Sequence, residues 1–182
     1  SRKYVWLAAI ALIVIGADQW TKFLVFEHLT TAFDRAPGPK LGVFFGAAPE
    51  AAFDGYHFRP KGQVVLSDEF FRLRYAENPG AAFGLFRNVP PEYRGPLFHL
   101  VPLGAVGLPL SLGAVVLIAF AVRKLKGEKD EVWARWGLPL VLGGALGNYV
   151  DRLARGFVID FLEAHWHEQA YWPAFNVADT AI

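Results

Sequence analysis

The sequence predicts a mainly α-helical membrane protein, a four-helix transmembrane bundle with a small β-element outside the bilayer. Of the 182 residues, 54% are hydrophobic, a high share for a domain surrounded by water. Three apolar segments approach the length of about 20 residues that a helix needs to cross a bilayer. Basic residues cluster at those segment ends that would share one side of the membrane. We therefore treat residues 1–182 as a single membrane-embedded domain.

Composition excludes several classes of site. The chain contains no cysteine, which excludes disulfides, a thiolate nucleophile and a cysteine-based zinc site. The formal net charge is +1, so the broad basic field of a nucleic-acid-binding protein is missing. We expect no nucleic-acid partner and no cofactor.

The first two predicted spans are residues 4–26 and 95–122. Only Asp18, Gln19 and Lys22 interrupt the first. It is longer than the apolar region of about 7–15 residues in a cleavable signal peptide, so we expect it to be a retained helix. The second span carries no formal charge and is expected to be a scaffold helix facing lipid.

The third predicted span is less regular. Residues 136–150 are uncharged and run directly into Asp151 and Arg152. Including these two residues gives the span its length only if their charges face protein or water, because charges facing lipid are costly. Residues 175–182 resemble the opening of a fourth helix, which we expect to be truncated at the last residue.

The distribution of basic residues predicts the orientation. Arg2 and Lys3 precede the first span, and a second cluster lies between the second and third spans: Arg123, Lys124, Lys126, Lys129 and Arg135. Both clusters should be cytoplasmic by the positive-inside rule. Residues 27–94 then lie outside. They contain two strand-like runs, 63–67 and 70–75, so we expect a small extracytoplasmic β-element there.

Polar and ionisable residues within the predicted spans form two groups. Asp18 and Lys22 are four residues apart, so they can pair on one helix face. Asn148, Asp151 and Arg152 also share one face. Charged residues in a membrane cost roughly 2.5–3.5 kcal/mol each and therefore usually have partners or a function.

Two more aspartates extend this set. Asp160 lies in an apolar stretch, and Asp179 lies at the start of the last segment. No Gly-x-Ser-x-Gly or His-Glu-x-x-His motif occurs, and His165 and His167 would point apart on a helix. Carboxylates are the remaining candidates for catalysis. Two carboxylates that lie close together share a proton, so that one can act as a base on water and the other as an acid. The residues alone leave open which of the four aspartates form the pair.

Five short blocks in order resemble the lipoprotein signal peptidases, also called signal peptidase II. The blocks are Asp18-Gln19-x-Thr21-Lys22, Asn78-Pro79-Gly80-Ala81-Ala82-Phe83-Gly84, Gly147-Asn148-x-x-Asp151-Arg152, Val158-Ile159-Asp160-Phe161 and Phe175-Asn176-x-Ala178-Asp179-x-Ala181-Ile182. Each block is weakly specific alone, but all five in the same order form a specific match.

The resemblance implies a four-helix aspartic protease of the bacterial inner membrane, with its active site near the outer, periplasmic face. Such enzymes cut the signal peptide from prolipoproteins before a diacylglyceryl-modified cysteine. The implied catalytic pair is Asp160 and Asp179. The implied substrate-binding or orienting residues are Asn78, Gly80, Asn148, Arg152 and Asn176, and the implied supporting residues are Asp18, Lys22 and Asp151. The implied partners are the lipid-modified substrate and membrane lipids, and we expect a monomer without a bound metal.

The chemistry of the surroundings agrees with this division. Apolar neighbours should raise the pKa of Asp160, while a helix start should favour ionised Asp179. Asp151, with Arg152 beside it and Lys22 as a possible partner, should stay ionised and shuttle protons poorly. One departure from the family is a longer stretch after the first helix, so that residues 30–63 form an insertion.

Two other functions fit parts of the sequence. A small proton- or ion-coupled transporter subunit would use Asp18, Asp151 and Arg152 as a relay, but it leaves the block at residues 78–84 unexplained. A non-catalytic scaffold that binds lipidated partners is the other alternative.

Overall fold

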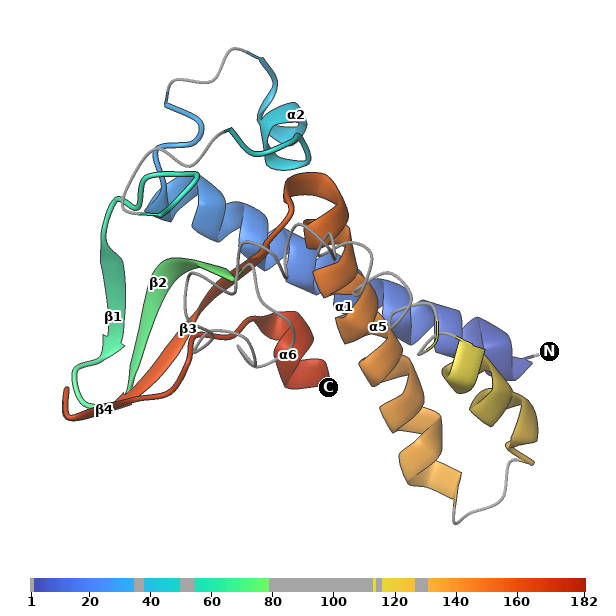
Figure 1. The fold of residues 1–182 in the computed structure, drawn as a ribbon. Coiled ribbons are helices and arrows are strands. Elements are labelled where there is room, and N and C mark those ends of the chain that lie inside the picture. The colour runs from blue at the N-terminus through green and yellow to red at the C-terminus, as the bar shows by residue number, and fades with distance from the viewer. Residues whose placement is uncertain (1, 35–37, 50–54, 79–112, 114–115, 127–130) are drawn as a thin grey trace, which may run out of the picture.

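The computed structural model describes residues 2–34, 38–49, 55–78, 113, 116–126 and 131–182. Figure 1 shows two long helices that lie against each other, with a small sheet near the end of α1 that is remote from the N-terminus. The named elements, in chain order, are α1 (Arg2–Leu29), α2 (Lys40–Phe44), β1 (Gln63–Ser67), β2 (Phe71–Asn78), α5 (Val132–Arg155), β3 (Val158–Trp166), β4 (Ala170–Tyr171) and α6 (Val177–Ala181).

Helix α1 confirms the first predicted span and extends it by a few residues at each end. Among the described residues it is the one helix long and apolar enough to cross a membrane. Val5 and Ile13 are each 70% exposed, which suits a helix face that contacts lipid. The opposite face is buried and includes Asp18 and Lys22.

Helix α5 covers the third predicted segment, which is thus confirmed as helical, and includes its charged end. It starts before residue 136 and continues through Asp151 and Arg152 to Arg155. The helix ends at Gly156, whose φ of 85° is left-handed and whose N–H donates to the Arg152 carbonyl. Glycine adopts this conformation without the cost that a Cβ would impose.

Glycines allow α1 and α5 to pack closely. A Cβ added at Gly143 would lie 2.6 Å from the Val14 Cβ, and one added at Gly147 would lie 2.7 Å from Asp18 Oδ2. Small residues at such contacts let backbones approach and strengthen packing between helices in a membrane. The close approach also brings the polar residues of the two helices into contact.

The second predicted span lies mostly outside the described residues. Residues 116–124 are helical, and their buried side chains pack against α1 and α5 in one apolar cluster: Leu7, Ala11, Ile118, Val122 and Leu142. Lys3 Nζ donates to the Arg123 and Leu125 carbonyls, at 2.9 and 3.2 Å. These bonds bring the two predicted basic clusters to the same end of the helices.

The sheet is antiparallel, with strand order β1-β2-β3-β4. Its first strand matches the predicted residues 63–67, and the second runs to Asn78 rather than ending at residue 75. The prediction that the β-element belongs to residues 27–94 is wrong in extent, because β3 and β4 follow α5. Tyr75 is fully buried, whereas Phe71 is 46% exposed, and the register shifts between Leu73 and Ala76.

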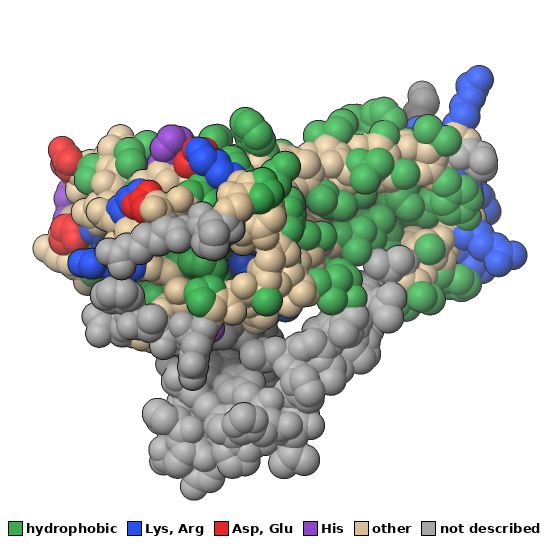
Figure 2. All heavy atoms as spheres, turned by 90° about the horizontal axis from the view of Figure 1, so that it is seen from above, with side chains coloured by type: hydrophobic (Ala, Val, Ile, Leu, Met, Phe, Trp, Pro, Cys, Tyr) green, Lys and Arg blue, Asp and Glu red, His purple; other side chains and the backbone are tan. Residues whose placement is uncertain are grey.

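A second core, rich in aromatic side chains, lies where the end of α1 meets the sheet. The Phe26 ring contacts the rings of Phe33, Phe44 and Phe58. The buried members of this core are Val25, Phe26, Leu29, Ala32, Phe44, Tyr75, Phe157, Ile159 and Phe161. Figure 2 shows hydrophobic side chains along the helices, with Lys and Arg gathered at one end and charges of both signs over the sheet.

Candidate active site

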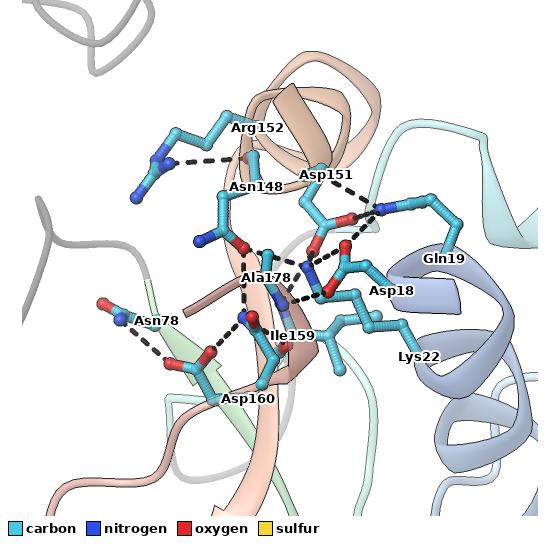
Figure 3. A network of polar contacts seen from close by, with 12 residues as sticks. Asp18, Gln19, Lys22, Asn78, Asn148, Asp151, Arg152, Ile159, Asp160 and Ala178 are labelled. Atoms are coloured by element: carbon cyan, nitrogen blue, oxygen red, sulfur yellow. Dashed lines mark hydrogen bonds and ion pairs between the residues drawn. The ribbon is translucent and has the colours of Figure 1, made fainter. Parts of the chain in front are cut away.

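A buried ionic cluster joins α1 to α5. Lys22 Nζ lies 2.8 Å from Asp18 Oδ2 and 2.9 Å from Asp151 Oδ2, and it donates to Asn148 Oδ1 at 3.0 Å. The side chains of Lys22 and both aspartates are fully buried. The predicted pairing of Asp18 with Lys22 is therefore confirmed. The cluster lies directly between the two helices (Figure 3).

The cationic partner of Asp151 on its own helix is Arg155, which corrects the expectation that Arg152 fills this position. Arg155 Nη2 lies 2.8 Å from Asp151 Oδ1. Arg152 instead extends away from Asp18 and Lys22 (Figure 3), and its Nη1 lies 3.5 Å from the Asn148 carbonyl oxygen. Consecutive helical residues point about 100° apart, so spacing of four favours Arg155.

Asp151 also binds the backbone at the start of β3. Its Oδ2 accepts the Ile159 N–H at 3.1 Å, and its Oδ1 accepts from Gln19 Nε2 at 2.9 Å. Ile159 is the residue immediately before Asp160. The buried ionic cluster therefore connects through one hydrogen bond to the backbone that carries Asp160.

Asp18 has the corresponding role at the other end of the site. Its Oδ1 accepts the Ala178 N–H at 3.0 Å, and Ala178 is the residue immediately before Asp179. A Cβ at Gly144 would lie 2.4 Å from the Ala178 carbonyl oxygen, so α6 lies directly on α5. Each buried carboxylate thus binds the backbone next to one of the two remaining aspartates.

Asp160 lies on β3 and is 2% exposed. Its Oδ2 accepts from Asn78 Nδ2 at 2.9 Å, and its Oδ1 accepts from Asn176 Nδ2 at 2.7 Å. Burial, and secondarily the negative charge of Asp179, raise the pKa of Asp160 from 3.8 to about 7. The predicted direction of this shift is confirmed.

Asp179 lies in the first turn of α6, where it forms a capping box with Asn176. The Asp179 N–H donates to Asn176 Oδ1 at 3.0 Å, and Asp179 Oδ2 accepts the Asn176 N–H at 3.2 Å. Asn148 Nδ2 donates to Asp179 Oδ1 at 2.8 Å. Asn176 therefore contacts both Asp160 and Asp179, and Asn148 accepts from Asn176 at 3.0 Å.

Most of the predicted site residues lie in this one network, which joins Asp18, Lys22, Asn78, Asn148, Asp151, Asp160, Asn176 and Asp179. Arg152 borders it on α5, and Gly80 lies outside the described residues. The residues in direct contact with the network that were not predicted as site residues include Gln19, Arg155, Ile159 and Ala178. Within the described part of the chain, no group of three His, Asp or Glu side chains is placed to hold a metal ion.

Comparison with known proteins identifies the family. Residues 10–182 match the family described as Signal peptidase (SPase) II. The chain belongs to the signal peptidase II family. The resemblance predicted from the five sequence blocks is thus confirmed, and the chain is a protease.

Two relatives, both named lipoprotein signal peptidase, align with nearly the whole chain. The lipoprotein signal peptidase of Anaeromyxobacter sp. is 39% identical over 99% of this chain and 80% of its own length. That of Syntrophotalea carbinolica is 46% identical over 97% of this chain and 83% of its own length. A solved bacterial membrane enzyme shares the fold, with a TM-score of 0.59 over 96% of this chain and 79% of that chain, at 19% identity.

Proposed function

We propose that this protein is an aspartic endopeptidase that removes the signal peptide from lipid-modified prolipoproteins, before the diacylglyceryl cysteine, with Asp160 and Asp179 as its catalytic pair. One observation carries the assignment of the pair. Asn176 donates to both carboxylates, with its side chain to Asp160 and its backbone N–H to Asp179. Asp18 and Asp151 instead form ion pairs with Lys22, which is consistent with a structural role in supporting the site.

The surroundings of the pair favour a division of roles. Two nearby carboxylates share one proton. Burial raises the pKa of Asp160 to about 7, so we assign the shared proton to Asp160. Asp179 is the base: it takes a proton from water while the water oxygen adds to the scissile carbonyl carbon. Asp160 gives its proton to the carbonyl oxygen. When the C–N bond breaks, the leaving amine takes the proton from Asp179 and Asp160 recovers its own from the diol.

Other polar residues would orient the pair and bind the substrate. Asn148 and Asn176 hold the two carboxylates at fixed angles. Asn78 ends β2 beside Asp160, and we propose that Asn78 and Gly80 present hydrogen-bonding groups to the extended peptide. Arg152, whose side chain points away from the ionic cluster, would bind a peptide carbonyl or the lipid phosphate.

The arrangement of the helices supports a multi-pass protein of the bacterial inner membrane. The basic N-terminus of α1 contacts residues 123–125, so the two basic clusters share one end, which we assign to the cytoplasm. The proposed catalytic pair lies toward the other ends of α1 and α5, which we assign to the periplasmic face. Helix α6 would begin the fourth span of a single-domain, monomeric bundle that is surrounded by lipid.

The proposed activity predicts cleavage of a lipid-modified prolipoprotein peptide by the protein in phospholipid nanodiscs. We expect one new peptide ending before the modified cysteine, detected by mass spectrometry, and about 10²-fold slower cleavage of the unmodified peptide, because binding energy from the lipid is lost. Proton flux through liposomes without any cleavage would contradict the proposal and favour the transporter alternative.

The raised pKa of Asp160 predicts an alkaline limit on activity. A group whose pKa is raised to about 7 is protonated below that pH and loses its proton above it. We therefore expect kcat/KM to fall about tenfold per pH unit above pH 7. The profile belongs to the coupled pair rather than to one residue.

Replacing Asn78 by leucine provides the control for this profile. The hydrogen bond from Asn78 to Asp160 favours the ionised carboxylate and lowers its pKa. Without that bond, the alkaline limb should move to higher pH while the overall rate falls. An alkaline limb that does not move in this variant would exclude Asp160 as the group that titrates.

A further inference from the structure

Residues 30–63, interpreted above as an insertion and called the insertion below, are described by the structure at 30–34, 38–49 and 55–63. The insertion is anchored at its base. Thr30 pairs with Pro60 in an antiparallel bridge. The Thr31 N–H donates to the Arg59 carbonyl at 3.0 Å, and the Lys61 N–H donates to the Leu29 carbonyl at 2.8 Å. The chain therefore leaves the end of α1 and returns to the same place before β1 begins.

Besides its aromatic packing on α1, the insertion makes a polar contact with Arg155. The insertion contains α2, and the backbone carbonyl of Phe44 at the end of α2 accepts from Arg155 Nη1. The guanidinium also lies over the Phe44 ring, 4.3 Å from its centroid. Both residues are buried. The other end of the same guanidinium binds Asp151 at 2.8 Å, and Asp151 accepts the Ile159 N–H.

A second polar contact of the insertion is with Glu77. The N–H groups of His57 and Phe58 donate to the Glu77 carboxylate at 3.0 Å, and His57 Nδ1 lies 2.7 Å from Glu77 Oε2. The Glu77 side chain is 5% exposed. Glu77 immediately precedes Asn78, which donates to Asp160, and it pairs with Ile159 across the two strands.

Both contacts lead to the same short stretch of backbone. One reaches the Ile159 N–H through Arg155 and Asp151, and the other reaches Ile159 through the pairing of β2 with β3. Resting on the function proposed above, we infer that the insertion positions Asp160 for catalysis, with Arg155 and Glu77 as positioning residues. Removing either contact leaves the reacting groups present but misaligned.

The test is a double-mutant cycle at the first contact, with the full chain in nanodiscs and a lipid-modified peptide as substrate. Arg155→Lys keeps a cation for Asp151 but lacks the second guanidinium nitrogen that donates to the Phe44 carbonyl. Phe44→Leu removes the ring beneath the guanidinium. We expect each to lower kcat about tenfold with KM within about twofold, because small misplacements of reacting groups are costly. The kcat of the double variant should match that of the slower single variant, because both substitutions break the same contact between Arg155 and Phe44.

Phe33→Leu is the matched control. Phe33 is another phenylalanine of the insertion, and among the described residues its ring contacts Phe23, Phe26 and Lys40 rather than Arg155. It should lower the thermal midpoint while leaving kcat unchanged, which separates positioning from stability. Glu77→Gln, which weakens the second contact, should lower kcat in the same way as Arg155→Lys.

Two outcomes would overturn the inference. One is a normal kcat in both Arg155→Lys and Phe44→Leu; the other is a double variant whose loss is the product of the single losses. If the wild-type protein still cleaves the substrate, either result would contradict only the inference and not the proposed function. Absence of cleavage by the wild-type protein would instead overturn the proposed function, and the inference with it.

Discussion

Replacing Asp160 or Asp179 by asparagine is expected to lower kcat by about 10³-fold or more, because either change removes one half of a proton-sharing pair. Asparagine has the same shape, and its carbonyl oxygen can still accept one of the two N–H hydrogen bonds that each carboxylate accepts. The variants should therefore remain folded, with thermal midpoints within a few degrees of the wild type. Cleavage of the lipid-modified peptide and a parallel melting curve measure both quantities.

The double variant and a surface control make this prediction specific. Residues that act as one unit lose activity non-additively, so Asp160→Asn combined with Asp179→Asn should be no slower than the slower single variant. Asp34→Asn removes an exposed carboxylate that pairs with Lys61 and should leave kcat unchanged. More than a tenth of wild-type activity in either single variant would contradict the assignment of the pair.

The helices were predictable because their signal is local. The apolar run of α1 and the i, i+4 spacing of Asp18 and Lys22 are visible in consecutive residues. Strand β3 was not predictable in the same way, since the apolar run around Asp160 fits a helix or a strand equally well. Its hydrogen-bonding partner, β2, is 80 or more residues away in the sequence.

The division between the four aspartates also depends on long-range contacts. Asp18 and Asp151 differ from Asp160 mainly in that both face Lys22, and the sequence alone could not show this for Asp151. The family resemblance supplied the choice instead. Glu77 was missed because its partners are backbone N–H groups of the insertion, which no sequence motif reveals.

Replacing Asp151 by asparagine is expected to have the largest effect on stability. Asp151 is fully buried and is bound to Lys22, Arg155 and the Ile159 N–H. The change leaves one more buried cation than buried carboxylate. Breaking a buried ion pair on one side costs about 3–5 kcal/mol, which corresponds to a fall of roughly 10 °C in the thermal midpoint of a protein of this size.

A compensating change distinguishes the charge imbalance from simple loss of contacts. Asp18, Lys22, Asp151 and Arg155 together have no net formal charge. Combining Asp151→Asn with Arg155→Met removes one charge of each sign, and an apolar side chain in place of a buried ion is often tolerated. The double variant should therefore melt at a higher temperature than Asp151→Asn alone, although it should remain slow in cleavage because Arg155 no longer links the insertion to β3. If the double variant is the less stable of the two, hydrogen bonding rather than charge balance is the main contribution of Asp151.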